Sequence, residues 1–385
     1  MPTLLTTKDL YPHPRQQNYQ DIRSEEQCLA LFSSHKDTPI ERVAFHNIAL
    51  PQEALQHEFR GCIFLSCKMP HGLKRRFTDS LVFPDMGELF RFQSTLYTAE
   101  TLYEGYEQGK PETIKTCYDG LVYQHYLQKG KRATDVKETL ARTLHDHSIS
   151  SALHEFLSPY REEDIVGVMG GHGISRLSRQ YEDIALISKR LTERGKLMIS
   201  GGGPGAMEAT HLGALMAGRS DGELQEALET LRTAPEFTDP RWLDTAFTVR
   251  RTYPQHAFES VGIPTWLYGH EPATPLATRI AKYFDNSIRE DGILSLACGG
   301  VIYTPGSAGT LQEIFQDAVQ NHYLSLGYAS PMVFYSRQYW LDEVPVYPLI
   351  QELISKGKYL NLLTSLSDRV EDICQAILTF TPARG

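Results

Sequence analysis

The fold is decided by residues 300–313, whose sequence is GVIYTPGSAGTLQE. This stretch is typical of a short apolar strand, a glycine-rich turn and the first turn of a helix. Glycines allow a sharp turn and let an anion approach main-chain N–H groups without a Cβ in the way. The free N–H groups and the dipole of a helix starting at Thr310 favour negative charge at this point. The stretch therefore predicts a phosphate-binding turn, although a tight turn without a ligand can give the same pattern.

Two strand, turn and helix units of the same kind precede this stretch. Residues 164–169 (DIVGVM) predict a strand that ends in Gly170-Gly171-His172-Gly173, and a helical pattern follows over 177–194. A second strand at 196–200 leads into the glycine turn 201–205 and a helix over 206–217. Such alternation is typical of a parallel sheet whose loops meet in one crevice. Two glycine turns can thus surround one ligand, the alternative for 201–205 being close packing of helix on strand.

The remaining segments extend this pattern. The predicted strands lie at 260–267, 299–303 and 332–335, and the predicted helices at 274–288, 310–321, 346–356 and 368–378. Between about 219 and 257 the pattern breaks into a charged helix at 222–232, a proline-containing loop and the pair Arg250-Arg251. We interpret this segment as an insertion that caps the site. The arginine pair either reaches a phosphate or is solvated.

The first 155 residues have a less regular pattern. Strands are predicted at 42–45 and 62–66 and helices at 86–108 and 137–157, and no internal repeat is found. The expected architecture is an α/β, Rossmann-like doubly wound parallel sheet over residues 156–385. A separate mixed α/β N-terminal domain of unassigned role is expected over residues 1–155.

Composition excludes several classes of function. The formal net charge of -9 argues against a nucleic-acid binder, which needs a basic face. Apolar stretches fall short of the ~20 residues that span a bilayer, and residues 1–21 lack the apolar core of a signal peptide. We therefore expect a cytoplasmic protein with no nucleic-acid or membrane partner. The six cysteines form no C-x-x-C pair, which indicates free thiols rather than a zinc or redox site.

Several polar residues are candidates for chemistry. Glu313 falls in the first turn of the phosphate-side helix, where it either faces the ligand or only complements the helix dipole. Arg289 can offer a planar guanidinium to a phosphate or a ribose oxygen, the alternative being a solvated surface residue. His172 either lines the crevice or bonds its own loop. A metal site at 145–147 (HDH) with His154 is disfavoured, because histidines at i and i+2 do not share a helix face.

Four motifs together resemble a known family. They are GGHGIS at 170–175, SGGGPGAMEA at 200–209, the arginine at 289 and TPGSAGTLQE at 304–313. This combination resembles the LOG ("Lonely Guy") phosphoribohydrolases, once called lysine decarboxylases, and within them the bacterial pyrimidine/purine nucleotide 5'-monophosphate nucleosidases. The resemblance covers residues from about 164 to 363.

The resemblance implies roles for particular residues. Glu313 and Arg289 match the catalytic pair of the family. Contacts to the phosphate or the substrate are implied for Gly306, Ser307, Gly309, Thr310, Gly203, Gly205, Met207, Glu208, Gly171 and His172. Two positions depart from the family pattern: Ser307 replaces a glycine, and Glu290 stands where plant-type members carry lysine.

The function that the resemblance implies is hydrolysis of the N-glycosidic bond of nucleoside 5'-monophosphates, giving free base and ribose 5-phosphate. Glu313 would stabilise an oxocarbenium-like transition state or activate water. No cofactor or metal is implied, and a homo-oligomer is expected. Two alternatives stay open: a module of the same fold that binds a nucleotide without turnover, and a transferase that uses the same ribosyl chemistry.

Overall fold

The computed structural model describes residues 19–36 and 38–382. Most of the segment from which the absence of a signal peptide was expected lies outside the described residues. The chain divides into two compact units. The smaller unit holds the described residues up to Leu96 together with Arg132–Phe156, and the larger holds Tyr97–Lys131 and the rest. The boundary expected near residue 155 therefore differs for 97–131, which belongs to the larger unit.

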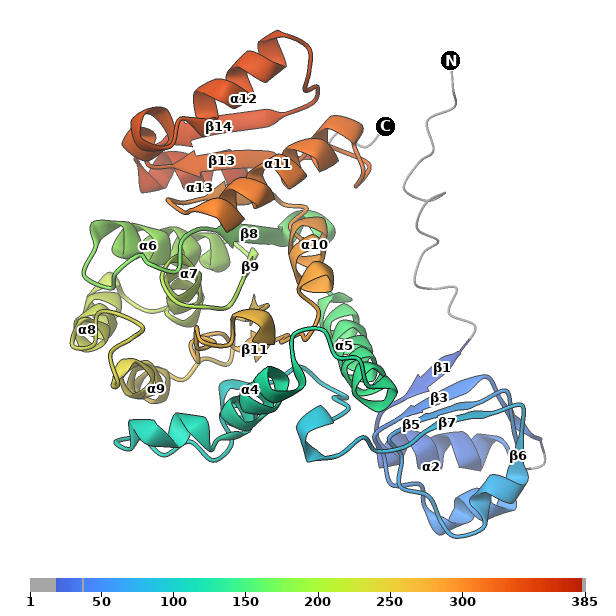
Figure 1. Cartoon of the computed structure of the whole chain (residues 1–385). Coiled ribbons are helices and arrows are strands. Elements are labelled where there is room, and N and C mark those ends of the chain that lie inside the picture. Colours follow the sequence, from blue (N-terminus) through green and yellow to red (C-terminus); the bar gives the residue numbers. More distant parts are fainter. Residues whose placement is uncertain (1–18, 37, 383–385) are drawn as a thin grey trace, which may run out of the picture. The chain divides into compact units, whose positions relative to one another are not determined.

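The larger unit is built on a seven-stranded sheet (Figure 1). Its strand order is β11-β10-β9-β8-β12-β13-β14, with parallel neighbours throughout. The strands are β8 (Ile165–Met169), β9 (Leu197–Ser200), β10 (Ser260–Gly262), β11 (Arg279–Ile280), β12 (Val301–Tyr303), β13 (Pro331–Tyr335) and β14 (Leu363–Ser367). The strand order reverses between β8 and β12, which is where sheets of this class bind ligands. This topology confirms the predicted Rossmann-like α/β fold.

Helices connect these strands. They are α6 (Arg179–Glu193), α7 (Ala206–Leu215), α8 (Asp221–Arg232), α9 (Trp242–Thr252), α10 (Asn286–Leu296), α11 (Ala308–Tyr323), α12 (Val346–Ser355) and α13 (Val370–Leu378). Short helical turns lie at η6 (Glu162–Asp164), η7 (Trp266–Tyr268) and η8 (Tyr339–Glu343). No helix among residues 19–36 and 38–382 is long and apolar enough to cross a membrane.

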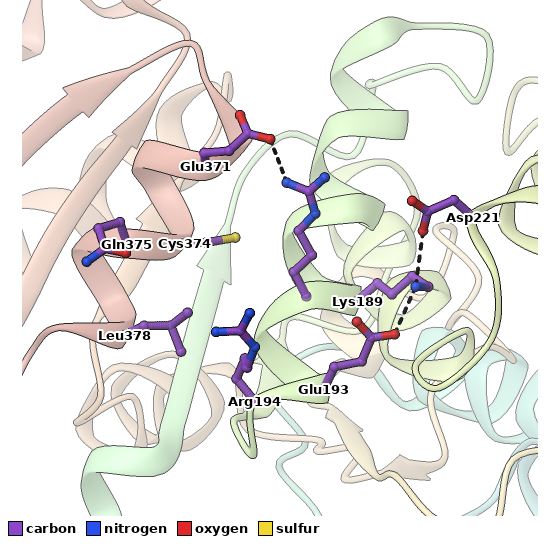
Figure 2. A pocket seen from close by; sticks show the side chains of 9 residues that line it. Lys189, Glu193, Arg194, Asp221, Glu371, Cys374, Gln375 and Leu378 are labelled. Atoms are coloured by element: carbon purple, nitrogen blue, oxygen red, sulfur yellow. Dashed lines mark hydrogen bonds and ion pairs between the residues drawn. The ribbon is translucent and has the colours of Figure 1, made fainter.

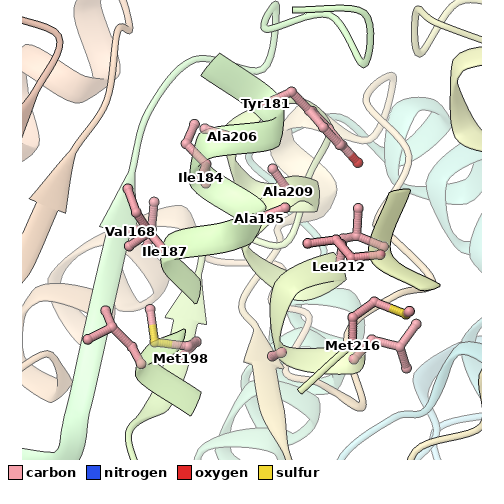
Figure 3. Packing of buried hydrophobic residues seen from close by; sticks show 14 of the residues in the cluster. Val168, Tyr181, Ile184, Ala185, Ile187, Met198, Ala206, Ala209, Leu212 and Met216 are labelled. Carbon is pink, nitrogen blue, oxygen red and sulfur yellow. The ribbon is translucent and has the colours of Figure 1, made fainter. Parts of the chain in front are cut away.

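The main apolar core lies beside the sheet, where α6 packs against α7 and α13, and Figure 3 shows the part of it around α6 and α7. Helix α6 begins after Ser178, whose hydroxyl accepts a hydrogen bond from the Tyr181 N–H at 3.1 Å. Its buried side chains, among them Ile184, Ile187 and Leu191, recur at helical spacing. Burial of this stripe fixes α6 and α7 against each other, and with them the loops that precede both helices.

One predicted helix of this unit is wrong. Of residues 274–288, the part 274–284 is extended and largely buried and contains β11, and the helix begins only at Asn286. Leu276, Ala277, Ile280 and Ala281 are all buried, and their spacing imitates the apolar stripe of a helix. Strand pairing and burial on all sides outweigh that pattern.

The segment 97–131 adds α3 (Ala99–Leu102), the turn η5 (Pro111–Lys115) and α4 (Tyr118–Lys129) to the larger unit. Its backbone pairs antiparallel with Ile280 at the sheet edge through Tyr97. The buried Asp119 carboxylate accepts hydrogen bonds from the Lys282 ammonium at 2.6 Å and the Trp266 indole N–H at 2.9 Å. These buried, charge-assisted bonds attach the segment to the sheet.

The smaller unit winds in successive parallel coils. Its two sheets have the orders β1-β3-β5-β7 and β2-β4-β6. Its elements are β1 (Gln20–Ile22), α2 (Glu25–Ser34), β2 (Ile40–Glu41), β3 (Val43–His46), η2 (Gln52–Gln56), β4 (Phe59–Arg60), β5 (Ile63–Leu65), η3 (Leu73–Arg76), β6 (Phe77–Thr78), β7 (Leu81–Phe83), η4 (Glu88–Phe90) and α5 (Val136–Leu157). Each coil gives one strand to each sheet, and inside the coils Phe64 stacks on Phe45 at 4.9 Å and on Phe77 at 4.4 Å.

The backbone of these coils repeats although the sequence shows no repeat. Arg42, Gly61 and Asp79 occupy equivalent corners before β3, β5 and β7, with φ of 54°, 58° and 51°. Asn47 and Ser66 form the corresponding corners after β3 and β5. The predicted strands at 42–45 and 62–66 are confirmed by β3 and β5, whereas the predicted helix at 86–108 is wrong, because only η4 and α3 are helical there.

Candidate functional site

Three glycine turns of the larger unit meet at one edge of the sheet. Strands β8 and β12 end level, with Met169 beside Tyr303, and β9 ends with Ser200 beside Val168. The Gly171 N–H then donates to the Pro305 carbonyl at 2.9 Å, which joins the turn after β8 to the turn after β12. The sequence alone predicted this convergence only from the rule that carboxyl ends of parallel strands share one edge.

Close backbone approach explains two of the glycines. Gly205 has φ of +67°, and a Cβ there would overlap the Gly171 carbonyl and lie 2.7 Å from the His172 carbonyl oxygen. A Cβ at Gly306 would overlap the Thr310 hydroxyl and lie 2.9 Å from the Gly171 nitrogen. Side chains are therefore excluded where the three turns touch.

Helix α11 points an uncapped N-terminus at this junction. Ser307 is its N-cap residue and makes no side-chain capping bond. Within the part of the chain that the structure describes, the N–H groups of 308–310 donate to no acceptor. Ser307 has φ of -97°, so serine fits this turn without the left-handed strain that would demand glycine. Free N–H groups and the helix dipole together make the turn attractive to an anion.

Arg289 supplies a cation beside the second turn. It lies in α10, whose N-cap Asp285 accepts from the Ser287 N–H at 2.8 Å. The guanidinium is largely buried, its Nε donates to the Ile263 carbonyl at 2.9 Å, and its Nη2 occupies the space that a Cβ at Gly201 would need. This contact fixes the guanidinium beside the second glycine turn.

Two carboxyl groups lie one turn apart on α11. Burial raises the pKa of Glu313 to about 7, the nearby Arg289 cation opposes this shift, and Glu290 adds to it. Burial also raises the pKa of Asp317 to about 7, although Asp317 accepts a hydrogen bond from the Tyr303 hydroxyl at 2.7 Å. Glu313 is partly exposed at the site, whereas Asp317 is enclosed beneath it.

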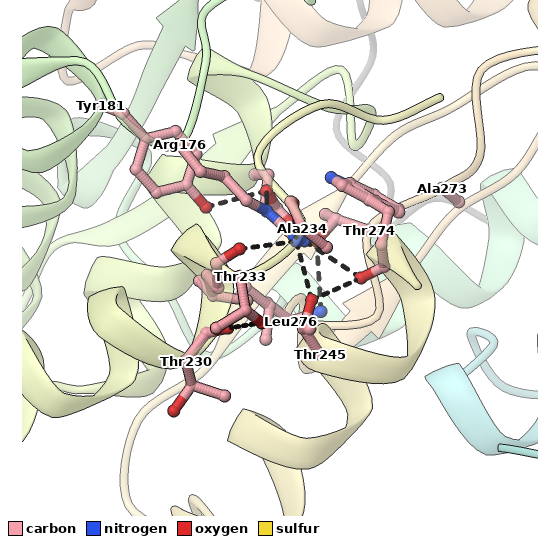
Figure 4. Close-up of polar contacts among 12 residues, drawn as sticks. Arg176, Tyr181, Thr230, Thr233, Ala234, Thr245, Ala273, Thr274 and Leu276 are labelled. Atoms are coloured by element: carbon pink, nitrogen blue, oxygen red, sulfur yellow. Dashed lines mark hydrogen bonds and ion pairs between the residues drawn. The ribbon is translucent and has the colours of Figure 1, made fainter. Parts of the chain in front are cut away.

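Glu208 lies elsewhere than the sequence implied. It is fully buried, and its carboxylate accepts a hydrogen bond from the Arg176 Nε at 2.8 Å and from the Tyr181 hydroxyl at 2.8 Å. Arg176 also donates to the carbonyls of Ala234 and Trp242, which belong to the inserted segment (Figure 4). The pair therefore holds the insertion against the loop at 170–176, and Glu208 is not available to a ligand.

Other residues with implied ligand contacts lie at the same turns. Met207 lies over the second turn, because Cβ atoms at Gly201 and Gly203 would lie 2.7 Å from its sulfur and 2.9 Å from its methyl carbon. Thr310 is buried and its hydroxyl faces Gly306, whereas Gly309 is exposed at the start of α11.

His172, at the end of β8, has a half-exposed side chain. Two further residues that the sequence did not indicate lie beside it. Phe237, from the insertion, meets the His172 ring edge to face at 5.8 Å, and a carboxylate oxygen of Glu271 lies 3.4 Å from the His172 Nδ1. The other Glu271 oxygen lies 3.8 Å from the Cβ position of Gly203. The inserted segment thus reaches the turn after β8. Neither residue stands in a recognisable motif, so only the fold could have identified them.

Two of the remaining polar residues that the sequence singled out are paired with other side chains. Arg250 donates to Glu100 at 2.8 Å, and His145 pairs with Asp146 at 3.0 Å. Among the described residues no group of three or more His, Cys, Asp or Glu side chains could hold a metal ion.

A separate pocket of about 430 Å³ lies between α6 and α13 (Figure 2). Two of its cations are already neutralised: Lys189 pairs with Glu193 and Asp221, and Arg190 pairs with Glu371. Paired charges of this kind offer an anion much less than the bare end of α11 does.

No protein-family model matches the chain, and no curated protein matches it. Solved structures similar to it include the molybdenum cofactor binding protein from the phototrophic bacterium Rippkaea orientalis, at 16% identity and a TM-score of 0.34, over 56% of this chain and 97% of that one. They also include the Moco carrier protein of Chlamydomonas rheinhardtii, at 17% identity and a TM-score of 0.33, over 56% of this chain and 94% of that one.

These findings correct the expected family and activity. These two structures are molybdenum cofactor proteins and not LOG phosphoribohydrolases, so the assignment to the nucleosidases is wrong, and with it the expected hydrolysis of nucleoside monophosphates. At such low identity and TM-score, the similarity itself assigns no ligand to this chain.

Proposed function

We propose that the larger unit is a binding module for a phosphorylated, nucleotide-like small molecule, which it holds without turnover. The observation that carries the proposal is the convergence of the turns after β8, β9 and β12 on the uncapped N-terminus of α11. A phosphate there would accept hydrogen bonds from the N–H groups at 308–310 and from the Thr310 hydroxyl.

The charged residues beside the three turns suit such a ligand. Arg289 is anchored through its Nε and its Nη1 lies 3.8 Å from a Glu290 carboxylate oxygen, which leaves its Nη2 beside Gly201 for a ligand oxygen. Glu313 has a pKa of about 7 because of burial, so near neutral pH its carboxyl group both donates and accepts hydrogen bonds. A sugar hydroxyl, which also does both, is the matching partner.

The test compares two variants of nearly equal shape. Gly309 is exposed, and a Cβ there would meet nothing within 4 Å, so Gly309→Asp and Gly309→Asn should both fold. The aspartate would place a negative charge where the phosphate binds while favouring the helix N-terminus. Calorimetric titration of the full chain with ribose 5-phosphate should show affinity weakened about tenfold or more by Gly309→Asp relative to Gly309→Asn. Equal affinity of the two variants would contradict the proposal.

A further inference from the structure

The stack of coils in the smaller unit ends in a layer that no further layer covers. The helical turn η3 and the strands β6 and β7 stack on η2, β4 and β5 of the preceding coil. We name residues 73–83, which hold η3, β6 and β7, the terminal coil. Strand β7 is the last of one sheet and β6 the last of the other, so within the described residues neither has a second neighbouring strand (Figure 1).

The apolar interior of the stack is open at the terminal coil. Two ladders of inward residues run through the coils, one in each sheet: Ile40, Phe59 and Phe77 in one, and Phe45, Phe64 and Val82 in the other. The four members that precede the terminal coil are 0% exposed, whereas Phe77 and Val82 are only partly buried. An apolar layer placed on Phe77 and Val82 would complete their burial, as capping layers do in stacked folds.

Strand β7 also presents unpaired backbone groups at this end. The Leu81 N–H donates to the Cys62 carbonyl at 2.8 Å. The Ser66 N–H donates to the Phe83 carbonyl at 2.9 Å, so Leu81 and Phe83 both face β5. Because the bonding direction alternates along a parallel strand, the N–H and the carbonyl of Val82 face the opposite way. In the part of the chain that the structure describes, neither group has a hydrogen-bond partner, which leaves this edge free to pair with one more strand.

The terminal coil also carries positive charge. Lys74, Arg75 and Arg76 follow one another in η3 and are all exposed. None of the three pairs with a carboxylate of the described residues, whereas Arg60 of the preceding coil pairs with Glu58 at 3.4 Å. Three adjacent cations repel one another, and an acidic partner relieves this repulsion. A second copy of the chain stacked on this end would instead bring its own three cations to the same place.

We propose that the terminal coil binds an extended acidic segment of a partner protein, which adds one further coil to the stack. The added coil runs parallel to the others, so its N-terminal part lies beside η3 and its C-terminal part beside β7. The segment therefore begins with acidic residues and continues with apolar residues that cover Phe77 and Val82. Its backbone pairs with Val82, as in other cases of a peptide added to a sheet edge. Nucleic acid would neutralise the cations, but it supplies neither a strand nor apolar side chains.

The probe is the peptide EEEFTDSLVF, which is residues 74–83 of this chain with the three cations replaced by glutamate. Its parent segment already forms a coil of this shape. One control is the unchanged segment KRRFTDSLVF, and the other is FTDSLVFEEE, which has the composition of the probe but the acidic residues at the wrong end. In fluorescence anisotropy with the full chain, the probe should bind about tenfold more tightly than either control.

Two matched pairs of changes separate charge from strand pairing. Arg75→Glu/Arg76→Glu should weaken binding of the probe about tenfold and strengthen binding of KRRFTDSLVF. Lys36→Glu, an exposed change outside the terminal coil, should alter neither. N-methylation of the final phenylalanine of the probe removes the N–H that would donate to the Val82 carbonyl, so it should weaken binding. N-methylation of the valine before it removes an N–H that faces away, so it should not.

Three results would overturn the proposal. The first is no binding of the probe, or equal binding of the probe and FTDSLVFEEE. The second is a uridine decamer that binds the wild-type chain more tightly than the probe and loses affinity in Arg75→Glu/Arg76→Glu, because nucleic acid would then be the occupant. The third is a dimer in sedimentation that dissociates in the same variant, because a second copy would then cover the terminal coil.

Discussion

Replacement of Gly205 by alanine should damage both the fold and the site. Its φ of +67° costs an alanine about 1–2 kcal/mol. The new Cβ would also lie 2.7 Å from the His172 carbonyl oxygen and overlap the Gly171 carbonyl, and overpacking against atoms held this rigidly costs about 1–3 kcal/mol. The free energy of unfolding should therefore fall by about 2–5 kcal/mol, which in a unit of this size lowers Tm by roughly 5–15 °C.

The assay is thermal unfolding followed by titration with ribose 5-phosphate, with Gly173→Ala as the control. A Cβ at Gly173 meets nothing within 4 Å, and its φ is not left-handed, so this variant should unfold and bind like the wild-type chain. Gly205→Ala should bind more weakly even well below its Tm, because the turn after β8 must move. If Gly205→Ala matches Gly173→Ala in both Tm and affinity, the reasoning that the three turns touch at this point is refuted.

Three further predictions concern the carboxyl groups and the cores. Because burial raises the pKa of Glu313 from 4.5 to about 7, the wild-type chain loses stability as the pH rises through that window. In thermal unfolding, Glu313→Gln should therefore be more stable than the wild-type chain near pH 8 and similar to it near pH 5. An equal difference in Tm at both pH values would contradict this. Arg176→Met leaves the buried Glu208 carboxylate unpaired and should lower the free energy of unfolding, measured in urea, by about 3–5 kcal/mol. The double variant Arg176→Met/Glu208→Met should partly reverse this loss. If it does not, the broken ion pair is excluded as the cause. Phe64→Ala should destabilise the smaller unit by about 3–5 kcal/mol and speed hydrogen exchange over β3 and β5, whereas unchanged exchange would show that the stacked rings do not hold the coils.

The larger unit was predictable because its strands, turns and helices leave strong local patterns. The pattern of a buried parallel strand followed by glycines and a helix predicts the structure correctly at β8, β9 and β12, and the rule on strand ends then brings their turns together. The helix predicted at 274–288 was wrong because burial on all sides removes the alternation of apolar and polar residues that marks a strand.

The smaller unit and the surroundings of Glu208 and Phe237 were not predictable, for different reasons. Strands of two to four residues are too short for periodicity, and the left-handed corners at Arg42, Ser66 and Asp79 carry no common residue type. Glu208 was implied as a ligand contact by the family resemblance of the motif at 200–209, and its actual partner Arg176 stands 32 positions away, outside any local window. The same arginine holds the loop before Phe237 through the carbonyls of Ala234 and Pro235.

A crystal structure of the full chain with guanosine 5'-monophosphate tests the central claim most directly. The account predicts an intact nucleotide whose phosphate oxygens lie within hydrogen-bond distance of the N–H groups at 308–310 and of the Thr310 hydroxyl. A phosphate bound away from the α11 N-terminus would contradict the binding site. Ribose 5-phosphate with separated guanine in the crevice would contradict binding without turnover.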